Sequence, residues 1–121
     1  MLSADGSRSF SGTSPGVNPG ELQVEVSGAE RSYEVRLLGA LDMSTATELR
    51  ERLIGLAAEG PAQVTVALSQ LAFVDSTGLS VLITGLKRFR QQGGDMALRS
   101  PTPATRRVLE ITGLTEVVAI S

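Results

Sequence analysis

The 121-residue sequence predicts one α/β domain, with a mixed, mostly parallel β-sheet of about five strands and helices packed on it. Two observations lead to this fold class. Apolar residues recur every second position in some segments and about every 3.6 positions in others, which indicates alternating strands and helices. The predicted helices separate the later strands, and parallel pairing needs such crossover connections. The expected element order is β-β-α-β-α-β-α-β.

Residues 1–20 differ in composition from everything that follows. Eleven of these twenty residues are Gly, Ser or Pro, and the few apolar ones show no period. A segment of this kind buries too little apolar surface to offset the entropy lost on ordering. The sequence therefore predicts a disordered tail over residues 1–20 and a folded domain over residues 21–121.

The domain is expected to open with a β-hairpin. Two short segments alternate between apolar and polar residues, which is typical of strands with one buried and one solvent-exposed face. We expect a turn over residues 27–30 and the end of the second strand at Gly39 and Ala40. The alternating apolar residues are Leu22, Val24 and Val26 in the first strand and Tyr33, Val35 and Leu37 in the second.

Two longer helices and a buried strand should follow. A helix over residues 45–58 is expected to start with a capping box formed by Thr45 and Glu48. A third strand at residues 64–68 leads to an apolar run at residues 71–74, and a second helix covers residues 77–92. The predicted inner positions are Ala46, Leu49, Leu53 and Leu56 in the first helix, and Leu79, Leu82, Ile83, Leu86 and Phe89 in the second.

The last third of the chain predicts a strand, a helix and a strand. Gly93 and Gly94 offer a left-handed end to the second helix, and residues 96–98 form the next strand. Thr102 and Pro103 begin a third helix. Proline is favoured at the first helical position, because an amide N–H there would have no partner within the helix. Gly113 ends that helix before a strand at residues 117–120. Its expected inner residues are Ala104, Val108 and Ile111.

Composition excludes most kinds of catalysis. The chain has no Cys and no His, so disulfides, thiolate metal sites and imidazole bases are absent, and its 13 acidic residues are scattered singly. We therefore expect no catalytic residue, no metal and no cofactor. A net charge of −2 is unlike that of a nucleic-acid binder. Since no signal peptide and no apolar run of about 20 residues is present, the prediction is a cytoplasmic protein without a membrane partner.

One segment has both a structural and a functional interpretation. It lies at the predicted strand-to-helix junction and consists of Asp75, Ser76, Thr77 and Gly78. In the simpler interpretation these residues cap the helix, since Asp, Ser and Thr all accept hydrogen bonds from free amides. In the functional interpretation Ser76 is phosphorylated, because a helix N-terminus favours a dianion. Gly78 either relaxes the first turn or lets a partner approach Ser76.

Two further features carry open alternatives. The second helix has a small, weakly apolar face that suits either a docking surface or a solvated one. This face is formed by Val81, Thr84, Gly85 and Arg88. Asp42, just before the first helix, is interpreted as a cap of that helix.

In its motifs the sequence resembles the STAS-domain anti-sigma factor antagonists over about residues 21–121. Residues 39–42 (Gly-Ala-Leu-Asp) stand where that family has a Gly-x-x-Asp turn, and residues 74–79 match its phosphorylation-site turn. Residues 111–114 (Ile-Thr-Gly-Leu) match the helix end before its last strand. Three motifs in this order make the resemblance specific.

The resemblance implies a partner-switching protein. The unphosphorylated form would bind an anti-sigma factor that is a Ser/Thr kinase of the histidine-kinase-like ATPase type, and would release the sigma factor. Phosphorylation of Ser76 would end binding, and a phosphatase would reset it. Asp75 and Gly78 would shape the turn around Ser76, and Asp42 would lie on the neighbouring loop near the docking surface. The stiffer Thr77 is expected to be structural. A monomer or weak dimer is expected.

The sequence also departs from the family pattern. Ala40 stands where Glu is frequent, Ser80 stands where Gly is frequent, and the usual final helix is not found after the last strand. Two alternative functions stay open. One is a STAS accessory subunit of a lipid or solute transporter. The other is a nucleotide-binding enzyme, which the absence of a Gly-rich phosphate loop disfavours.

Overall fold

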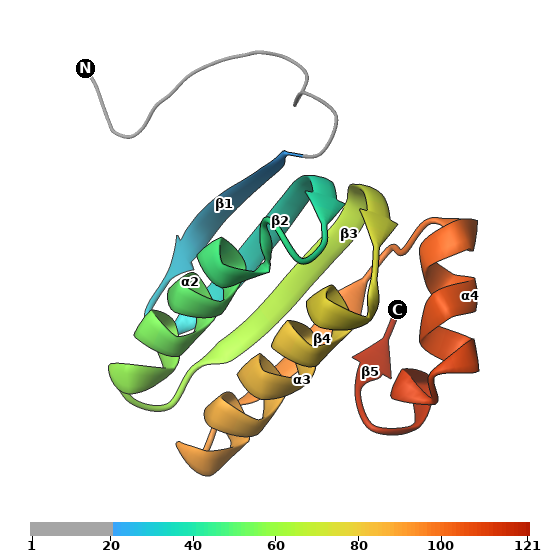
Figure 1. Cartoon of the computed structure of the whole chain (residues 1–121). Helices are drawn as coiled ribbons and strands as arrows, with labels where there is room; N and C mark the ends of the chain where they lie inside the picture. Colours follow the sequence, from blue (N-terminus) through green and yellow to red (C-terminus); the bar gives the residue numbers. More distant parts are fainter. Residues whose placement is uncertain (1–20) are drawn as a thin grey trace.

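The computed structural model describes residues 21–121, so the predicted tail over residues 1–20 lies outside the described residues. These residues form one five-stranded sheet in which the strands lie in chain order (Figure 1). β1 pairs with β2 antiparallel, and the other pairs are parallel, which confirms the predicted mixed sheet. The strands are β1 (Leu22–Ala29), β2 (Ser32–Leu41), β3 (Gln63–Val74), β4 (Asp95–Arg99) and β5 (Ala119–Ile120).

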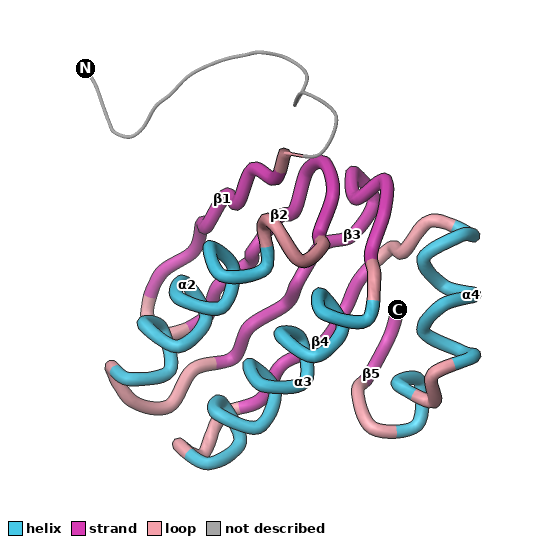
Figure 2. The backbone as a smooth tube through the Cα atoms, viewed as in Figure 1, coloured by secondary structure: helices cyan, strands magenta, loops and turns pink. Residues whose placement is uncertain are grey.

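Each parallel connection contains a helix, and the element order is the predicted one. The helices are α2 (Ala46–Ala58), α3 (Ser76–Gln91) and α4 (Pro103–Ile111), followed by the short 3₁₀ helix η1 (Leu114–Glu116). All three crossovers advance along the sheet in the same direction, and right-handed crossovers then place the helices on one face. In Figure 1, α2 and α3 lie side by side over the sheet, while α4 lies near β5. Figure 2 shows the loops before α2 and α3 at the same end of the sheet.

The core is a layer of apolar side chains between the sheet and α2 and α3. Val35, Val66 and Leu98 lie directly opposite one another on β2, β3 and β4, and all three are fully buried. Leu53 of α2 and Phe89 of α3 are also fully buried in this layer. The inner positions predicted for α2 and α3 are thus mostly confirmed, with Leu56 and Ile83 only partly buried.

The hairpin is longer and its turn tighter than the sequence predicted. The strands run to Ala29 and from Ser32, so the turn consists of Glu30 and Arg31 and not of residues 27–30. Both turn residues have positive φ, of 57° and 64°, as a two-residue type I′ turn requires. At the other end β2 continues to Leu41 and does not stop at Gly39. Neither turn residue is glycine, so the residue types gave no signal for this turn.

β3 is one continuous strand across the two segments that the sequence separates. Its pairing with β2 shifts register twice, between Arg36 and Leu38 and between Gly39 and Ala40. Each shift adds one residue to β3, which is the geometry of a β-bulge. As a result the neighbours Ser69 and Gln70 are both exposed, although strict alternation would bury one of them.

The inner face predicted for α4 is wrong at Ala104 and Ile111, whereas Val108 is partly buried and packs against the core. Thr105 and Leu109 are the buried residues of this helix, while Ala104 and Ile111 are exposed. A shift of one residue rotates the face by about 100°. Burial of Thr105 is possible because its hydroxyl oxygen lies 3.1 Å from that of Thr102, the N-cap residue. The predicted start at Thr102 and Pro103 is confirmed.

The predicted final strand at residues 117–120 is also too long. Only Ala119–Ile120 pair with β4, and Val117 and Val118 form the connection from η1 to this strand. Gly113 has a φ of 80°, which confirms it as the left-handed residue that ends α4.

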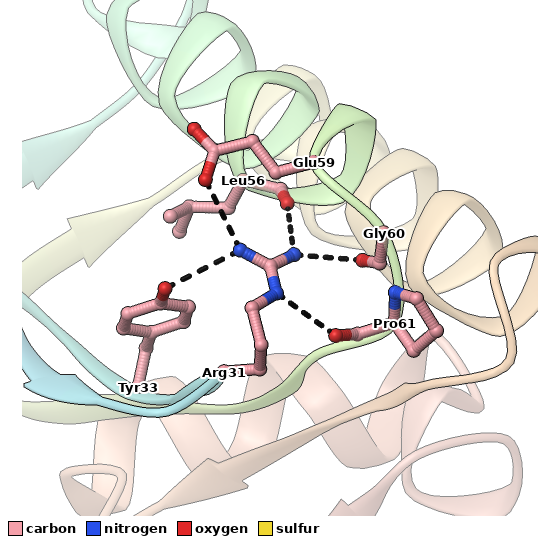
Figure 3. A network of polar contacts seen from close by, with 6 residues as sticks. All are labelled: Arg31, Tyr33, Leu56, Glu59, Gly60 and Pro61. Atoms are coloured by element: carbon pink, nitrogen blue, oxygen red, sulfur yellow. Dashed lines mark hydrogen bonds and ion pairs between the residues drawn. The ribbon is translucent and has the colours of Figure 1, made fainter.

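The side chain of Arg31 fastens the hairpin turn to the end of α2 (Figure 3). Its guanidinium donates to three main-chain carbonyl oxygens, one in the last turn of this helix and two in the segment that leads to β3. The same group pairs with Glu59 and lies over the ring of Tyr33, at 5.5 Å from the ring centroid. Cations stabilise the carbonyl end of a helix. The three acceptors are the oxygens of Leu56 (2.7 Å), Gly60 (2.7 Å) and Pro61 (3.0 Å).

We predict that Arg31→Ala lowers the free energy of unfolding by about 2 kcal/mol, because it leaves part-buried carbonyl oxygens without their donor. Arg31→Lys should recover little of the loss, since an ammonium cannot reproduce the planar fork. Urea unfolding followed by circular dichroism measures the change. Arg52→Ala, on the exposed side of α2, is the control, and equal midpoints for the Arg31 and Arg52 variants would contradict the prediction.

Candidate functional site

Asp75 begins α3 and holds its first turn. Its backbone is extended, and its Oδ1 accepts a hydrogen bond of 2.9 Å from the amide of Gly78. Ser76 is therefore the first helical residue, one position earlier than predicted. The predicted junction is confirmed, and the capping oxygen belongs to Asp75 and not to Ser76.

The same carboxylate also joins α3 to the loop before α2. Oδ2 of Asp75 accepts from the amide of Met43 at 3.2 Å, and the amide of Asp75 donates to the carbonyl of Leu41 at 3.1 Å. These contacts bring together two segments more than thirty residues apart in the chain. Asp42 and Asp75, which the resemblance associates with one surface, therefore lie on adjoining loops.

The loop before α2 is held by Asp42, Ser44 and Thr45. Oδ1 of Asp42 accepts from the amide of Ser44 at 2.9 Å and from its hydroxyl at 2.7 Å. The hydroxyl bond from Ser44 is the largest cause of a lowered pKa of Asp42. Desolvation opposes it as the second cause, and main-chain donation from Ser44 lowers the pKa further. Asp42 thus caps the turn that precedes α2 rather than the helix itself.

The predicted capping box at the start of α2 is wrong. Thr45 is the N-cap residue, but its hydroxyl makes no capping bond to Glu48. Instead Oγ1 donates to the carbonyl of Ala40 at 2.8 Å and accepts from the amide of Asp42 at 3.0 Å. The buried hydroxyl of Thr45 bonds to backbone groups at the end of β2 and in the loop before α2, and these compete with the helix amide.

Gly78 is buried and does not open the surface to a partner. A Cβ at this position would lie 2.6 Å from Cγ of Leu41 and 2.8 Å from its carbonyl oxygen. The missing side chain therefore lets the first turn of α3 approach the end of β2. This contact inside the domain accounts for a glycine at position 78 without a partner.

Ser76 and Thr77 are both exposed at the start of α3. Among residues 21–121, neither hydroxyl is recorded in a hydrogen bond, so the expected structural role of Thr77 finds no support in its contacts. An exposed hydroxyl at a helix N-terminus can accept a phosphoryl group without breaking a hydrogen bond that stabilises the fold. A phosphate there would meet the free amides of the first turn.

The outward face predicted for α3 is wrong at Val81 and Gly85. Both residues are buried, and a Cβ on Gly85 would lie 2.7 Å from Cδ1 of Leu53 in α2. The helix packs against α2 as well as against the sheet, which widens its buried side. Thr84 is half-buried and Arg88 is exposed. Arg88 is twelve residues beyond Ser76, about 18 Å along the helix, so the structure does not bring the two together.

Two exposed apolar side chains near Ser76 were missed by the sequence reasoning. Met43 is 79% exposed in the loop before α2, and Phe73 is 54% exposed near the end of β3. The sequence placed Phe73 in a buried run, and no signal marked the bulge that turns it outward. Phe73 also lines a small hollow of about 90 Å³ beside Ala104 and Val108 of α4.

The described residues offer no metal centre. Over residues 21–121 no group of three or more His, Cys, Asp or Glu side chains could hold a metal ion. Within the same residues, no helix combines the length and the apolar character that crossing a membrane requires.

Comparisons with known proteins agree on one family. The family model described as the STAS domain matches residues 23–121. The anti-sigma-B factor antagonist of Bacillus subtilis is 34% identical over 100 residues, which cover 83% of this chain and 91% of the relative. Among solved structures, an anti-sigma factor antagonist from Mycobacterium paratuberculosis superposes with a TM-score of 0.74 at 26% identity, covering 83% of this chain and 85% of that one. The unphosphorylated form of SpoIIAA, an anti-sigma factor antagonist, superposes with a TM-score of 0.71 at 22% identity, covering 84% and 88%.

We predict that Gly78→Ala lowers the free energy of unfolding by about 1–3 kcal/mol, because the added methyl group meets both the side chain and the backbone of Leu41. Gly55→Ala is the matched control on α2. Nothing lies within 4 Å of a Cβ there, so this change should raise stability by about 0.5–1 kcal/mol. Thermal unfolding measures both changes, and shifts of the same sign would contradict the proposed packing.

We further predict that the pKa of Asp42 lies below 3.8 and that Ser44→Ala raises it toward that value. A carboxyl with a lowered pKa in the folded state contributes stability above its unfolded pKa and loses it as the pH falls through the folded pKa. Carbon-detected NMR titration of the side chain measures the pKa. Thr112→Ala, remote from this loop, is the control, and an unchanged Asp42 pKa in Ser44→Ala would contradict the assignment.

Proposed function

Because the chain belongs to the STAS domain family, among the anti-sigma factor antagonists, we propose that it controls transcription by binding an anti-sigma factor and thereby releasing a sigma factor. The partner is a Ser/Thr kinase of the histidine-kinase-like ATPase type. This chain acts by binding and catalyses no reaction itself, and the complex forms in the cytoplasm. The domain over residues 21–121 acts as a monomer or weak dimer.

The phosphorylation switch is assigned to Ser76. The observation that supports it best is that Ser76 is exposed at the first position of α3 while Asp75 supplies the helix cap. The helix amides favour a phosphate at this place, so the modification should cost the fold little. The added charge of about −1.5 to −2 would lie beside the carboxylate of Asp75 and change the surface strongly.

The docking surface is proposed to surround Ser76 at this end of the sheet. Asp42 and Asp75 supply its carboxylates, and the exposed side chains of Met43 and Phe73 supply apolar contact area. Such side chains gain the most from burial against a partner. A phosphoryl group in the middle of this surface would have to be desolvated in the complex, which explains release of the kinase. A phosphatase that hydrolyses phosphorylated Ser76 resets the switch.

Incubation with ATP and each anti-sigma kinase of the source organism tests the proposal, with intact-mass spectrometry as the readout. We expect a gain of one phosphate in the unmodified sequence and in Thr77→Val, and none in Ser76→Ala. Binding of the kinase, measured by co-elution and titration, should weaken at least roughly tenfold after phosphorylation, as expected for an unpaired charge forced into an interface.

Two results would contradict parts of this proposal. Phosphate that persists in Ser76→Ala and disappears in Thr77→Val would transfer the acceptor role to Thr77. Absence of both phosphorylation and binding with every anti-sigma kinase would overturn the function itself. Ser80→Ala, exposed one turn further along α3, is the control for general effects of removing a hydroxyl.

A further inference from the structure

The sheet face opposite α2 and α3 carries a row of charged residues. Arg36 of β2, Ala67 of β3 and Arg99 of β4 lie directly opposite one another, so their side chains share one face. The neighbouring positions Val35, Val66 and Leu98 point into the core, which places Arg36, Ala67 and Arg99 on the outer face. Helices α2 and α3 lie over the other face of the sheet (Figure 1).

A polar hollow of about 350 Å³ lies on this outer face. The short side chain of Ala67 forms its floor and is only 6% exposed, because the two flanking arginines stand beside it. The bulge in β3 turns two consecutive polar residues, Ser69 and Gln70, toward the hollow. Its lining consists of Glu34, Arg36, Leu37, Ala67, Ser69, Gln70 and Arg99.

The two arginines retain donors for a ligand. Arg36 contacts Glu25 at 3.4 Å through one terminal nitrogen, and Arg99 pairs with Glu34 through one terminal nitrogen. All four side chains are about one third to one half exposed, so each ion pair is weak in water. A guanidinium has five N–H donors, and one contact to a carboxylate leaves the others available.

We propose that this hollow binds a small oxyanion, a phosphate or carboxylate group bridged between Arg36 and Arg99. The two arginines stand two strand spacings apart, about 9.6 Å between their Cα atoms, with Ala67 between them, so their long side chains can converge on one group. The lining itself holds two cations and one carboxylate, and the second carboxylate, Glu25, contacts Arg36 from outside the lining. Guanidinium groups bind both kinds of oxyanion in bidentate fashion. The hydroxyl of Ser69 and the amide of Gln70 add neutral donors at the rim.

Glu34 gives the proposal its sharpest test, because it holds Arg99 and also repels an anion. If the hollow binds an oxyanion, loss of this carboxylate should tighten binding, while loss of either arginine should weaken it. A purely structural role of these residues in the sheet would not produce effects of opposite sign.

The experiment is an NMR titration of the full chain with inorganic phosphate, and separately with citrate, at constant ionic strength set by chloride. We expect saturable shifts at the amides of Ala67, Ser69, Gln70 and Arg99. Arg36→Gln and Arg99→Gln should each weaken the apparent Kd about tenfold, as for loss of a charge-assisted bond, and Glu34→Gln should tighten it several-fold. The two titrations decide whether the bound group is a phosphate or a carboxylate.

Matched controls separate a site from general electrostatics. Arg52→Gln and Glu48→Gln, both exposed on α2, change the net charge equally and should leave the apparent Kd unchanged. Shifts that do not saturate, that spread over the surface, or that respond equally to Arg52→Gln and Arg99→Gln would overturn the proposal. Ser76→Ala should bind normally, so this test is independent of the phosphorylation switch.

Discussion

The carboxylate of Asp75 is the contact on which the candidate site depends. One oxygen satisfies the amide of Gly78 in the first turn of α3, and the other accepts from the amide of Met43 in the loop before α2. These bonds fix the start of the helix relative to the end of β2. They also leave the hydroxyl of Ser76 outside the capping arrangement. If Ser76 were the cap, phosphorylation would remove a bond that the helix needs, and the modification would weaken the fold as well as change the surface.

The arrangement of the crossovers divides the domain into three regions with separate roles. Helices α2 and α3 and the inner sheet face form the core, where Gly85 allows the two helices to approach closely. The end of the sheet that carries the loops before α2 and α3 presents the candidate switch (Figure 2). The outer sheet face carries charged residues and the polar hollow. A change of charge at Ser76 therefore acts on a surface that does not contribute to core packing, which suits a switch that leaves the domain folded.

Arg31 and Thr45, whose roles the sequence does not indicate, stabilise connections between elements of the fold. Arg31 adopts positive φ in a turn without glycine and uses its side chain to satisfy carbonyl oxygens at the end of α2. Thr45 uses its hydroxyl inside the loop before α2 and leaves the helix without a side-chain cap. In both cases a polar side chain serves backbone groups of a neighbouring segment. This stabilises loops that the residue types alone would not order.

The sequence by itself determined the element order, the mixed sheet, the start of α4 at Thr102 and the junction at Asp75, because each follows from local periodicity or from capping chemistry. Only the tertiary structure decided which helix faces are buried, since that depends on neighbours: α3 buries Val81 and Gly85 because α2 lies beside it, and α4 buries Thr105 because Thr102 satisfies its hydroxyl. The bulges of β3, which expose Phe73 and turn Ser69 and Gln70 outward, arise from register against β2. Pairing between strands is a relation between distant segments, and no local pattern encodes it.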